Sequence, residues 1–559
     1  MKIASILGVF AALCLCSLAP AQEDIISLFE KAQSGDAQSQ YELGLRYFKG
    51  DGIKKDMVKA LGWYRKAAEQ GHAMAKQTLE LVSDLGIDAV SPDVTPVAGP
   101  PPPPAEAPVS SSAAEEEFQK GKRYYEGKEV PKNATEAFKH LLVAAEQGHP
   151  EAQGYLAVLY GNGEGVARNF TESVRWAKMG AEKGDGRAMN CLGVSYMNGE
   201  GVEKNLQEAI RWFNQAVDKG FASAQVNLGG IYLDGEGVPK NPSEAARLFR
   251  LAADQGFHKG QHAMGLCYLN GTGLPEEAAE AVRWFTLAAD QGNANSQYLL
   301  GYCYEQGKGV PQNPREAFNW YKKSADQGNA DAQFKVGLIY AEGKGVVQDN
   351  AEAARWYKMS ADQGKAFAMH NLGRLYEFGT GVPKDLNKAA SLYTSAAQQG
   401  VVISQMRMAY FYKIGLGVQV NYKEAYKWLK AAADQGDARA LLSMGDFYLE
   451  GVGVAVDYQE AVRYYRLSAD QGDADAQCLL GSMYYNGKGV RRDYKEALKW
   501  FKLSADAGNA NAQCFMGVCY VNGQGVAKNR NEGIRWFRLA AKQGNETAIS
   551  NLRKFGLKP

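Results

Sequence analysis

The sequence predicts an all-α solenoid built from 36-residue repeats. The first observation is a glycine that recurs every 36 residues from Gly148 to Gly544. The second is that each 36-residue unit contains two amphipathic helical patterns separated by a Gly-x-Gly turn. The third is that all nine tryptophans occupy one register of the unit. A fixed period of roughly 20–50 residues is typical of stacked repeats, in which each unit buries its apolar face against its neighbours.

The chain begins with a segment that is predicted to direct export. Lys2 supplies a positive charge, Ile3–Leu18 is an apolar run, and Ala19–Ala21 is a small-x-small cleavage site. The run is shorter than the ~20 residues that a membrane-spanning helix needs, which favours removal over anchoring. We therefore predict a signal peptide over residues 1–21 and a periplasmic or secreted mature chain without a transmembrane segment.

A short block of repeat sequence is predicted to follow, over residues 22–85. It contains one unit, marked by Gly35 and Gly71, and then a single capping helix over Ala73–Leu85. Residues 86–113 hold eight of the 18 prolines, a composition typical of a semi-rigid polyproline linker. The alternative for this proline-rich segment is a ligand for a proline-binding domain.

The main array is predicted over residues 114–555. It comprises twelve repeats and a last lone helix, Glu546–Phe555, that caps the exposed apolar face of the final repeat. In the fifth unit the first helix is expected over Ala222–Leu233 and the second from Pro242 to about Gln255. The turn between them contains two glycines, which adopt positive φ at little cost and reverse the chain.

Glycines also occur inside the first helices, where each costs ~1 kcal/mol of helix propensity. Gly229 and Gly301 lie sixteen residues before the small residues Ala245 and Ala317. We expect the two helices of a unit to approach closely at these pairs, because a larger side chain would not fit there.

The net charge, the cysteine positions and the absence of catalytic motifs limit the classes of function that the chain could have. The chain has 63 Lys and Arg against 62 Asp and Glu, so no basic field indicates a nucleic-acid partner. Six cysteines outside the signal peptide lie on first helices, and equivalent positions in stacked helices are ~8–10 Å apart, beyond the ~7 Å limit for a disulfide. They are expected to be mostly buried free thiols.

No catalytic motif such as Ser-x-x-Lys or His-Glu-x-x-His occurs, and His258 and His262 have no third ligand nearby. We therefore expect no catalytic residue, no metal and no cofactor.

The segment Ala330–Gly364, ADAQFKVGLIYAEGKGVVQDNAEAARWYKMSADQG, closely resembles the Sel1-like repeat, a relative of the tetratricopeptide repeat. The resemblance covers most of the mature chain. It implies a right-handed α/α superhelix whose first helices line a concave face, and it implies a role as an adaptor or scaffold. A cysteine-rich subgroup of the family, described as β-lactamase-like, has a cysteine pair that joins the two helices of each repeat. This chain departs from that pattern, because its cysteines lie only on first helices.

The tetratricopeptide register predicts which residues point into the concave face. They are the residue after the motif glutamine, the residue after the internal glycine, and the two residues after the register tyrosine. In the middle of the array these positions hold aromatic, Arg and Met side chains, which are typical of a groove that binds a peptide or helix. The alternative is that the rings pack against neighbouring units. The predicted site residues are Tyr298, Tyr302, Glu305, Phe334, His370, Arg374, Glu377, Phe378, Met406 and Tyr410.

The resulting hypothesis is a non-enzymatic, exported, monomeric scaffold that binds a protein or peptide partner on its concave face. A cell-wall or β-lactam-interacting protein of the cysteine-rich subgroup is the alternative from another class, although no nucleophile motif supports it. A purely structural spacer is the third.

Overall fold

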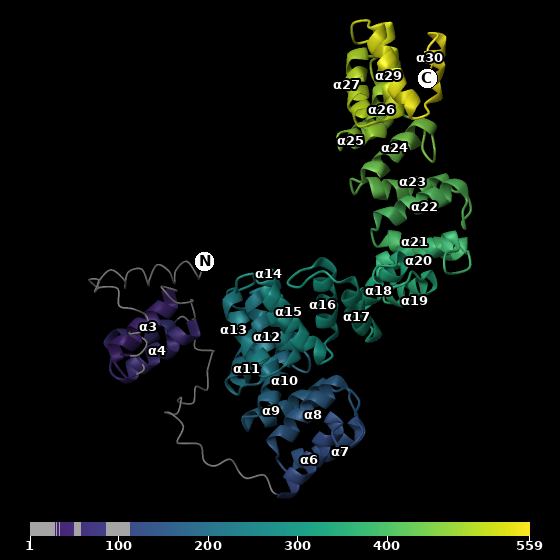
Figure 1. Ribbon diagram of the computed structural model, residues 1–559. Helices are drawn as coiled ribbons and strands as arrows, with labels where there is room; N and C mark the ends of the chain where they lie inside the picture. Colours follow the sequence, from purple (N-terminus) through teal and green to yellow (C-terminus); the bar gives the residue numbers. More distant parts are fainter. Residues whose placement is uncertain (1–27, 29–30, 33, 50–56, 85–111, 559) are drawn as a thin grey trace. The chain divides into compact units, whose positions relative to one another are not determined.

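A computed structural model describes residues 28, 31–32, 34–49, 57–84 and 112–558 (Figure 1). The predicted signal peptide and almost all of the predicted linker lie outside these residues. The chain divides into two compact units at residues 107 and 108. The first unit contains the helices α3 (Ala37–Lys49), α4 (Met57–Glu69) and α5 (Ala73–Asp84).

The second unit is a solenoid of twelve helix pairs and a last single helix, and no strand occurs in its described residues. Figure 1 shows the pairs stacked in chain order from the blue end to the yellow C-terminus. The all-α repeat solenoid is therefore confirmed. The first helices of the pairs, with the last single helix, are α6 (Ser112–Glu126), α8 (Pro150–Asn162), α10 (Gly186–Asn198), α12 (Ala222–Asp234), α14 (His258–Asn270), α16 (Ala294–Gln306), α18 (Ala330–Glu342), α20 (Ala366–Phe378), α22 (Val402–Ile414), α24 (Ala438–Glu450), α26 (Ala474–Asn486), α28 (Ala510–Asn522) and α30 (Glu546–Lys554).

The second helices complete the pairs. They are α7 (Ala134–Glu146), α9 (Phe170–Glu182), α11 (Leu206–Asp218), α13 (Pro242–Asp254), α15 (Ala278–Asp290), α17 (Pro314–Asp326), α19 (Asn350–Asp362), α21 (Leu386–Gln398), α23 (Tyr422–Ala433), α25 (Tyr458–Ala469), α27 (Tyr494–Asp506) and α29 (Arg530–Lys542). The first helix of the array begins at Ser112, two residues before the predicted start of the array at residue 114.

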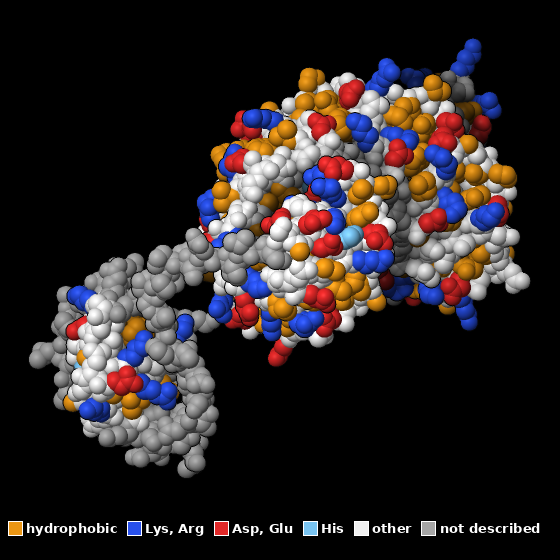
Figure 2. Space-filling view, turned by 90° about the horizontal axis from the view of Figure 1, so that it is seen from below, with side chains coloured by type: hydrophobic (Ala, Val, Ile, Leu, Met, Phe, Trp, Pro, Cys, Tyr) orange, Lys and Arg blue, Asp and Glu red, His pale blue; other side chains and the backbone are white. Residues whose placement is uncertain are grey.

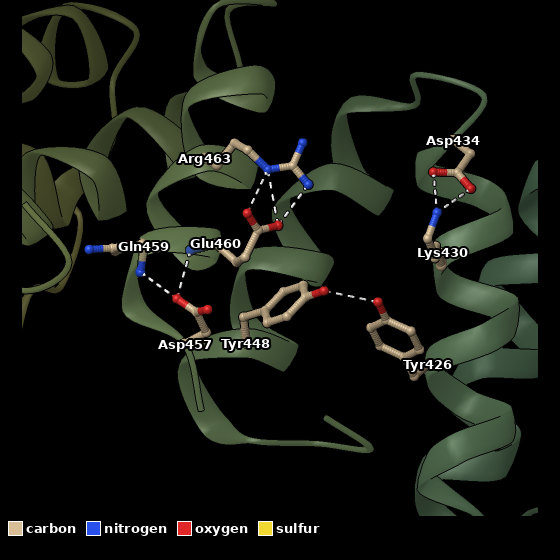
Figure 3. Close-up of polar contacts among 8 residues, drawn as sticks. All are labelled: Tyr426, Lys430, Asp434, Tyr448, Asp457, Gln459, Glu460 and Arg463. Atoms are coloured by element: carbon tan, nitrogen blue, oxygen red, sulfur yellow. Dashed lines mark hydrogen bonds and ion pairs between the residues drawn. The ribbon is translucent and has the colours of Figure 1, made fainter. Parts of the chain in front are cut away.

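Each helix begins and ends at residues that the sequence marks. Figure 3 shows the start of α25, where the Asp457 carboxylate accepts hydrogen bonds from the backbone N–H groups of Gln459 (2.9 Å) and Glu460 (3.1 Å). These bonds satisfy two amide groups that have no partner within the helix. First helices end at a glycine with positive φ, such as Gly451 after α24. The cap therefore sets the same helix length in unit after unit.

The motif glutamine connects successive units. In α18, Gln333 is buried, and its Nε2 donates to the carbonyl of Ala325 at the end of the preceding helix (3.2 Å). Its Oε1 accepts a hydrogen bond of 2.7 Å from Nε2 of Gln363, 30 residues later. The same amide pair recurs between Gln297 and Gln327. Since a buried amide without a partner would be costly, this pair fixes how the second helix packs on its unit where both glutamines are present.

The core is a row of small clusters rather than one large centre. One such cluster joins Tyr321 of α17 and Val336 of α18 to Trp356 of α19, so it spans two successive units. Every tryptophan of the array is buried or half-buried, in agreement with the prediction that this register belongs to the core. Tyr426 and Tyr448 show how the rings also bridge helices, since their hydroxyl groups lie 2.9 Å apart between α23 and α24 (Figure 3).

The close approach at the helical glycines is confirmed, and the nearest atoms belong to a ring that the sequence reasoning did not name. A Cβ on Gly229 would lie 2.5 Å from the ring of Phe249, twenty residues later, whereas no Ala245 atom is among the three nearest heavy atoms. Gly301 meets Tyr321 in the same way, at 2.7 Å. The reason is that a large ring of the second helix lies against the glycine, so the glycine accommodates an aromatic side chain instead of a small one.

Alanine substitutions at two neighbouring glycines in α12 are predicted to change the free energy of unfolding in opposite directions. Gly229→Ala forces a methyl group into the buried Phe249 ring and should lower the free energy of unfolding by ~1–3 kcal/mol. Gly230→Ala meets no atom within 4 Å and should raise it by up to ~1 kcal/mol through helix propensity. Urea denaturation followed by circular dichroism measures both. Equal shifts of the two midpoints would contradict the close packing of Phe249 on Gly229.

Candidate functional site

Exposed apolar side chains gather on two adjacent first helices, α20 and α22. Among the described residues of 112–558, no other first helix carries a large apolar side chain that is exposed. The most exposed of these side chains, Phe378, has 63% of its surface accessible. Single exposed apolar residues are ordinary, but a cluster on adjacent elements indicates a contact surface. The cluster consists of Phe367, Phe378, Ile403, Tyr410 and Ile414, and we call it the α20–α22 patch.

A pocket of about 400 Å³ opens beside the patch, between α22 and α24. Its floor is apolar, since Ala409, Leu429 and Phe447 are buried there. Ile403 and Tyr410 of the patch belong to its rim. The remaining lining residues are Met406, Arg407, Lys413, Arg439, Ser443 and Asp446. A hollow of this size with an apolar floor and a few polar groups is typical of a binding site.

An ion pair between the buried Glu377 and the half-buried Arg407 holds α20 against α22 under the patch. Glu377 is only 5% exposed and accepts hydrogen bonds from the Tyr393 hydroxyl (2.8 Å) and from Arg407 Nε (2.9 Å), and a second Arg407 nitrogen contacts its other oxygen. The Arg407 guanidinium also lies 4.9 Å from the ring centre of Tyr410 and 5.9 Å from that of Phe378. The arginine is therefore fixed between a carboxylate and two exposed rings, which orders the surface.

The same arrangement occurs two units earlier. Glu305 accepts hydrogen bonds from the Tyr321 hydroxyl (2.7 Å) and from Lys335 Nζ (2.8 Å), and these partners lower the pKa of Glu305 against the effect of burial. Glu305 and Glu377 thus bind structural partners from the following helices. Of the two, Glu377 has almost no surface left for a partner protein.

Four predicted site residues are less exposed than their sequence register suggested. Tyr298, Phe334, His370 and Met406 are half-buried between units. Tyr298 packs on Tyr321, with ring centres 5.4 Å apart, and burial together with Arg374 and Arg407 lowers the pKa of His370 to about 4. These side chains lie at the seam between neighbouring helices, in line with the alternative that the rings pack against neighbouring units, and their part in partner binding stays a prediction.

Of the other predicted residues, three are exposed and Tyr302 is half-buried like the four above. Phe378 and Tyr410 are exposed members of the patch, Arg374 is exposed on α20, and Tyr302 is half-buried on α16. Their part in partner binding stays a prediction. The structure brings Phe378 and Tyr410 together through Arg407, whereas Tyr302 belongs to a cluster two units away.

The sequence reasoning did not name Phe367, Ile403, Arg407 or Ile414. In α22, Ile403, Arg407 and Ile414 follow i, i+4 and i+11 and share one helix face with the predicted Tyr410 at i+7. The equivalent position to Ile403 in α20 is Phe367.

Comparison with known proteins assigns the family. The Sel1 repeat model matches residues 37–72, 121–149 and every successive 36-residue segment from 150–185 to 510–545. The chain belongs to the Sel1 repeat family. Sel1 repeats form a scaffold-like fold that commonly mediates protein interactions and is typically non-catalytic.

Several relatives are similar to this Sel1 protein. The chain is 42% identical over 60 residues to the secretory immunoglobulin A-binding protein EsiB of Escherichia coli O6:H1, a match that spans 11% of this chain and only 12% of that protein. A protective antigen of uropathogenic Escherichia coli with an SLR fold is 30% identical, with 95% of this chain and 97% of that chain covered and a TM-score of 0.45. A Sel1 repeat protein from Oxalobacter formigenes is 30% identical, with 58% and 93% covered and a TM-score of 0.46.

The six cysteines among the described residues of this Sel1 chain are free thiols, as predicted. Five of the six are buried and Cys191 is half-buried. Burial raises the pKa of Cys267 to about 11 and that of Cys478 to about 12, which keeps them protonated and unreactive at neutral pH.

The histidine pair of α14 makes hydrogen bonds to the next unit. His258 Nδ1 lies 2.9 Å from Asn293 Nδ2, and His262 Nδ1 lies 2.8 Å from Ser296 Oγ. In the part of the chain that the structure describes, no three His, Cys, Asp or Glu side chains are grouped as metal ligands, and no helix is long and apolar enough to cross a membrane.

Proposed function

We propose that this Sel1 protein is an exported, non-enzymatic scaffold that binds a segment of a partner protein at the α20–α22 patch and its adjoining pocket. The observation that carries the proposal is the concentration of exposed large apolar side chains on these two helices, alone among the described first helices of residues 112–558. Hiding such a cluster from water favours association, at about 25 cal/mol for each Å² that is buried. A relative named for binding secretory immunoglobulin A supports a protein as the class of partner.

The arrangement of the patch suits a protein segment better than a small molecule. The pocket is open beside the patch, and the exposed rings of Phe378 and Tyr410 are joined by one fixed arginine. Aromatic and arginine side chains held rigidly in this way dominate the binding energy of protein interfaces. Figure 2 shows one face of the molecule, on which side chains of both charges are mixed with apolar groups.

Capture of partners from an envelope extract of the native host tests the proposal. The patch variant combines Phe378→Ser, Ile403→Ser and Tyr410→Ser. It should capture at least about tenfold less partner than the wild type, because each change removes an apolar anchor of the kind that contributes ~2 kcal/mol or more. Circular dichroism checks that the helices are intact.

A matched control removes the same kind of surface elsewhere. It combines Leu251→Ser, Leu467→Ser and Leu503→Ser on second helices, where the side chains are 38%, 43% and 52% exposed against 63%, 43% and 44% for Phe378, Ile403 and Tyr410. The control variant should retain wild-type capture. Equal capture by the wild type, patch variant and control variant would show that the patch is not the binding surface.

Export is the second part of the proposal and has its own test. The apolar run and the Ala19–Ala21 cleavage sequence support it. N-terminal sequencing of the protein recovered from the host should begin at Gln22. A sequence that begins at Met1 would contradict export by cleavage of this segment.

A further inference from the structure

The charged side chains around the pocket are divided between paired and unpaired groups. Arg407 pairs with Glu377, and Lys413 Nζ lies 3.2 Å from Glu450. Arg439, on the pocket rim, is exposed and has no ion pair among the described residues. Arg374, on α20 next to the patch, is likewise exposed and without an ion pair there. Two guanidinium groups are thus left without a carboxylate in the described part of the chain.

The carboxylates near the pocket are already engaged. Glu377 is almost completely buried and bonded to Arg407 and Tyr393. Asp446, on the pocket wall, accepts a hydrogen bond from the Tyr465 hydroxyl at 2.7 Å. Glu450 faces Lys413. Asp446 has no ion pair among the described residues, so a ligand at this surface meets one unpaired carboxylate and the two unpaired guanidinium groups of Arg439 and Arg374, a net positive charge.

The pocket floor is apolar and closed, in contrast to the charged groups around the pocket. Ala409, Leu429 and Phe447 have at most 5% of their side chains exposed, and the hollow above them measures about 400 Å³. A hollow of this size accommodates one large apolar side chain. A ligand that fills the floor and also satisfies the rim must combine an apolar group with negative charge nearby.

We propose that the partner segment presents one large apolar side chain between α22 and α24, flanked by carboxylates that pair with Arg439 and Arg374. This inference rests on the proposed function and names the chemistry of its partner. Arginine forms two parallel hydrogen bonds with a carboxylate, so the two guanidinium groups give selectivity as well as attraction. Charge at the rim of an apolar interface acts chiefly on specificity and association rate, and basic segments are excluded by repulsion.

Fluorescence anisotropy of the full chain with three labelled peptides tests the inference. The first peptide has a central tryptophan between Asp and Glu residues, the second has the same tryptophan between lysines, and the third replaces the tryptophan of the first with alanine. The first should bind at least about tenfold more tightly than either of the others. Its affinity should fall as salt is added, because exposed ion pairs are screened.

Arg439→Glu is the decisive variant, and Arg538→Glu on α29 is its matched control. Arg538 is also exposed and lies near the C-terminal end of the array. Arg439→Glu should abolish the preference for the acidic peptide over the lysine peptide, whereas Arg538→Glu should leave it unchanged. Equal binding of the acidic and lysine peptides to the wild type, an unchanged preference in Arg439→Glu, or no binding of any peptide at millimolar concentration would overturn the inference.

The peptide test of the acidic partner and the capture test of the proposed function can fail independently of each other. Capture from the envelope extract that is lost in the patch variant but unchanged in Arg439→Glu would leave the α20–α22 patch as the binding surface and would refute the acidic partner. Capture that is unchanged in both variants would refute the patch itself.

Discussion

Gly453→Ala is expected to lower the free energy of unfolding of the array by about 3 kcal/mol or more, a large effect for a single methyl group. Gly453 is the second glycine of the turn after α24 and has a φ of +73°. A Cβ there would lie 2.1 Å from the carbonyl oxygen of Tyr422 at the start of α23. A backbone atom held in a helix cannot move aside, so the turn and the preceding unit would have to separate.

Gly436→Ala is the matched control for this change. Gly436 has a φ of +83°, also in the left-handed region, but a Cβ added there would have no atom within 4 Å. It should therefore lose only the ~1–2 kcal/mol that a left-handed backbone costs a residue with a Cβ. Urea denaturation of both variants measures the difference. Equal losses of stability in the two variants would show that the turn does not pack tightly against the preceding unit.

Arg407→Met should cost about 3–5 kcal/mol, because it leaves the Glu377 carboxylate buried without its cation. The methionine keeps most of the aliphatic packing, so the loss of stability measures the effect of removing the positive charge. Adding Glu377→Gln should restore a large part of the stability, since the double variant no longer buries an unpaired charge.

A double-mutant cycle measures the coupling between Arg407 and Glu377 from the four urea midpoints. A coupling below about 0.5 kcal/mol would mean that the pair contributes little to joining α20 and α22. In that case the arginine would not be fixed between the exposed rings of Phe378 and Tyr410.

The fold could be predicted from sequence because each local signal agrees with the repeat. The predicted helix Ala222–Leu233 is observed as Ala222–Asp234, and the second helix of that unit begins at Pro242 as expected. Capping residues, turn glycines and apolar spacing all act within a few residues of one another. The 36-residue period then dictates how the units stack, so long-range information was hardly needed.

The candidate site was harder to predict, because it depends on packing between units. Glu377 is buried by Tyr393 and Arg407, which lie 16 and 30 residues later, and no local pattern reveals that pairing. Similarly, the ring that packs on Gly229 comes from Phe249. A register borrowed from a related repeat placed Tyr410 and Phe378 on the open face but also included the half-buried Phe334.

Site-specific photo-crosslinking in the native host tests the central claim most directly. A photoreactive phenylalanine analogue at position 410, on the α20–α22 patch, should form a discrete adduct with a partner protein, because Tyr410 is exposed beside the pocket. The same analogue at position 503, a similarly exposed site on the second helix α27, should form none. Adducts of the same protein from both positions, or from 503 alone, would contradict binding at the patch.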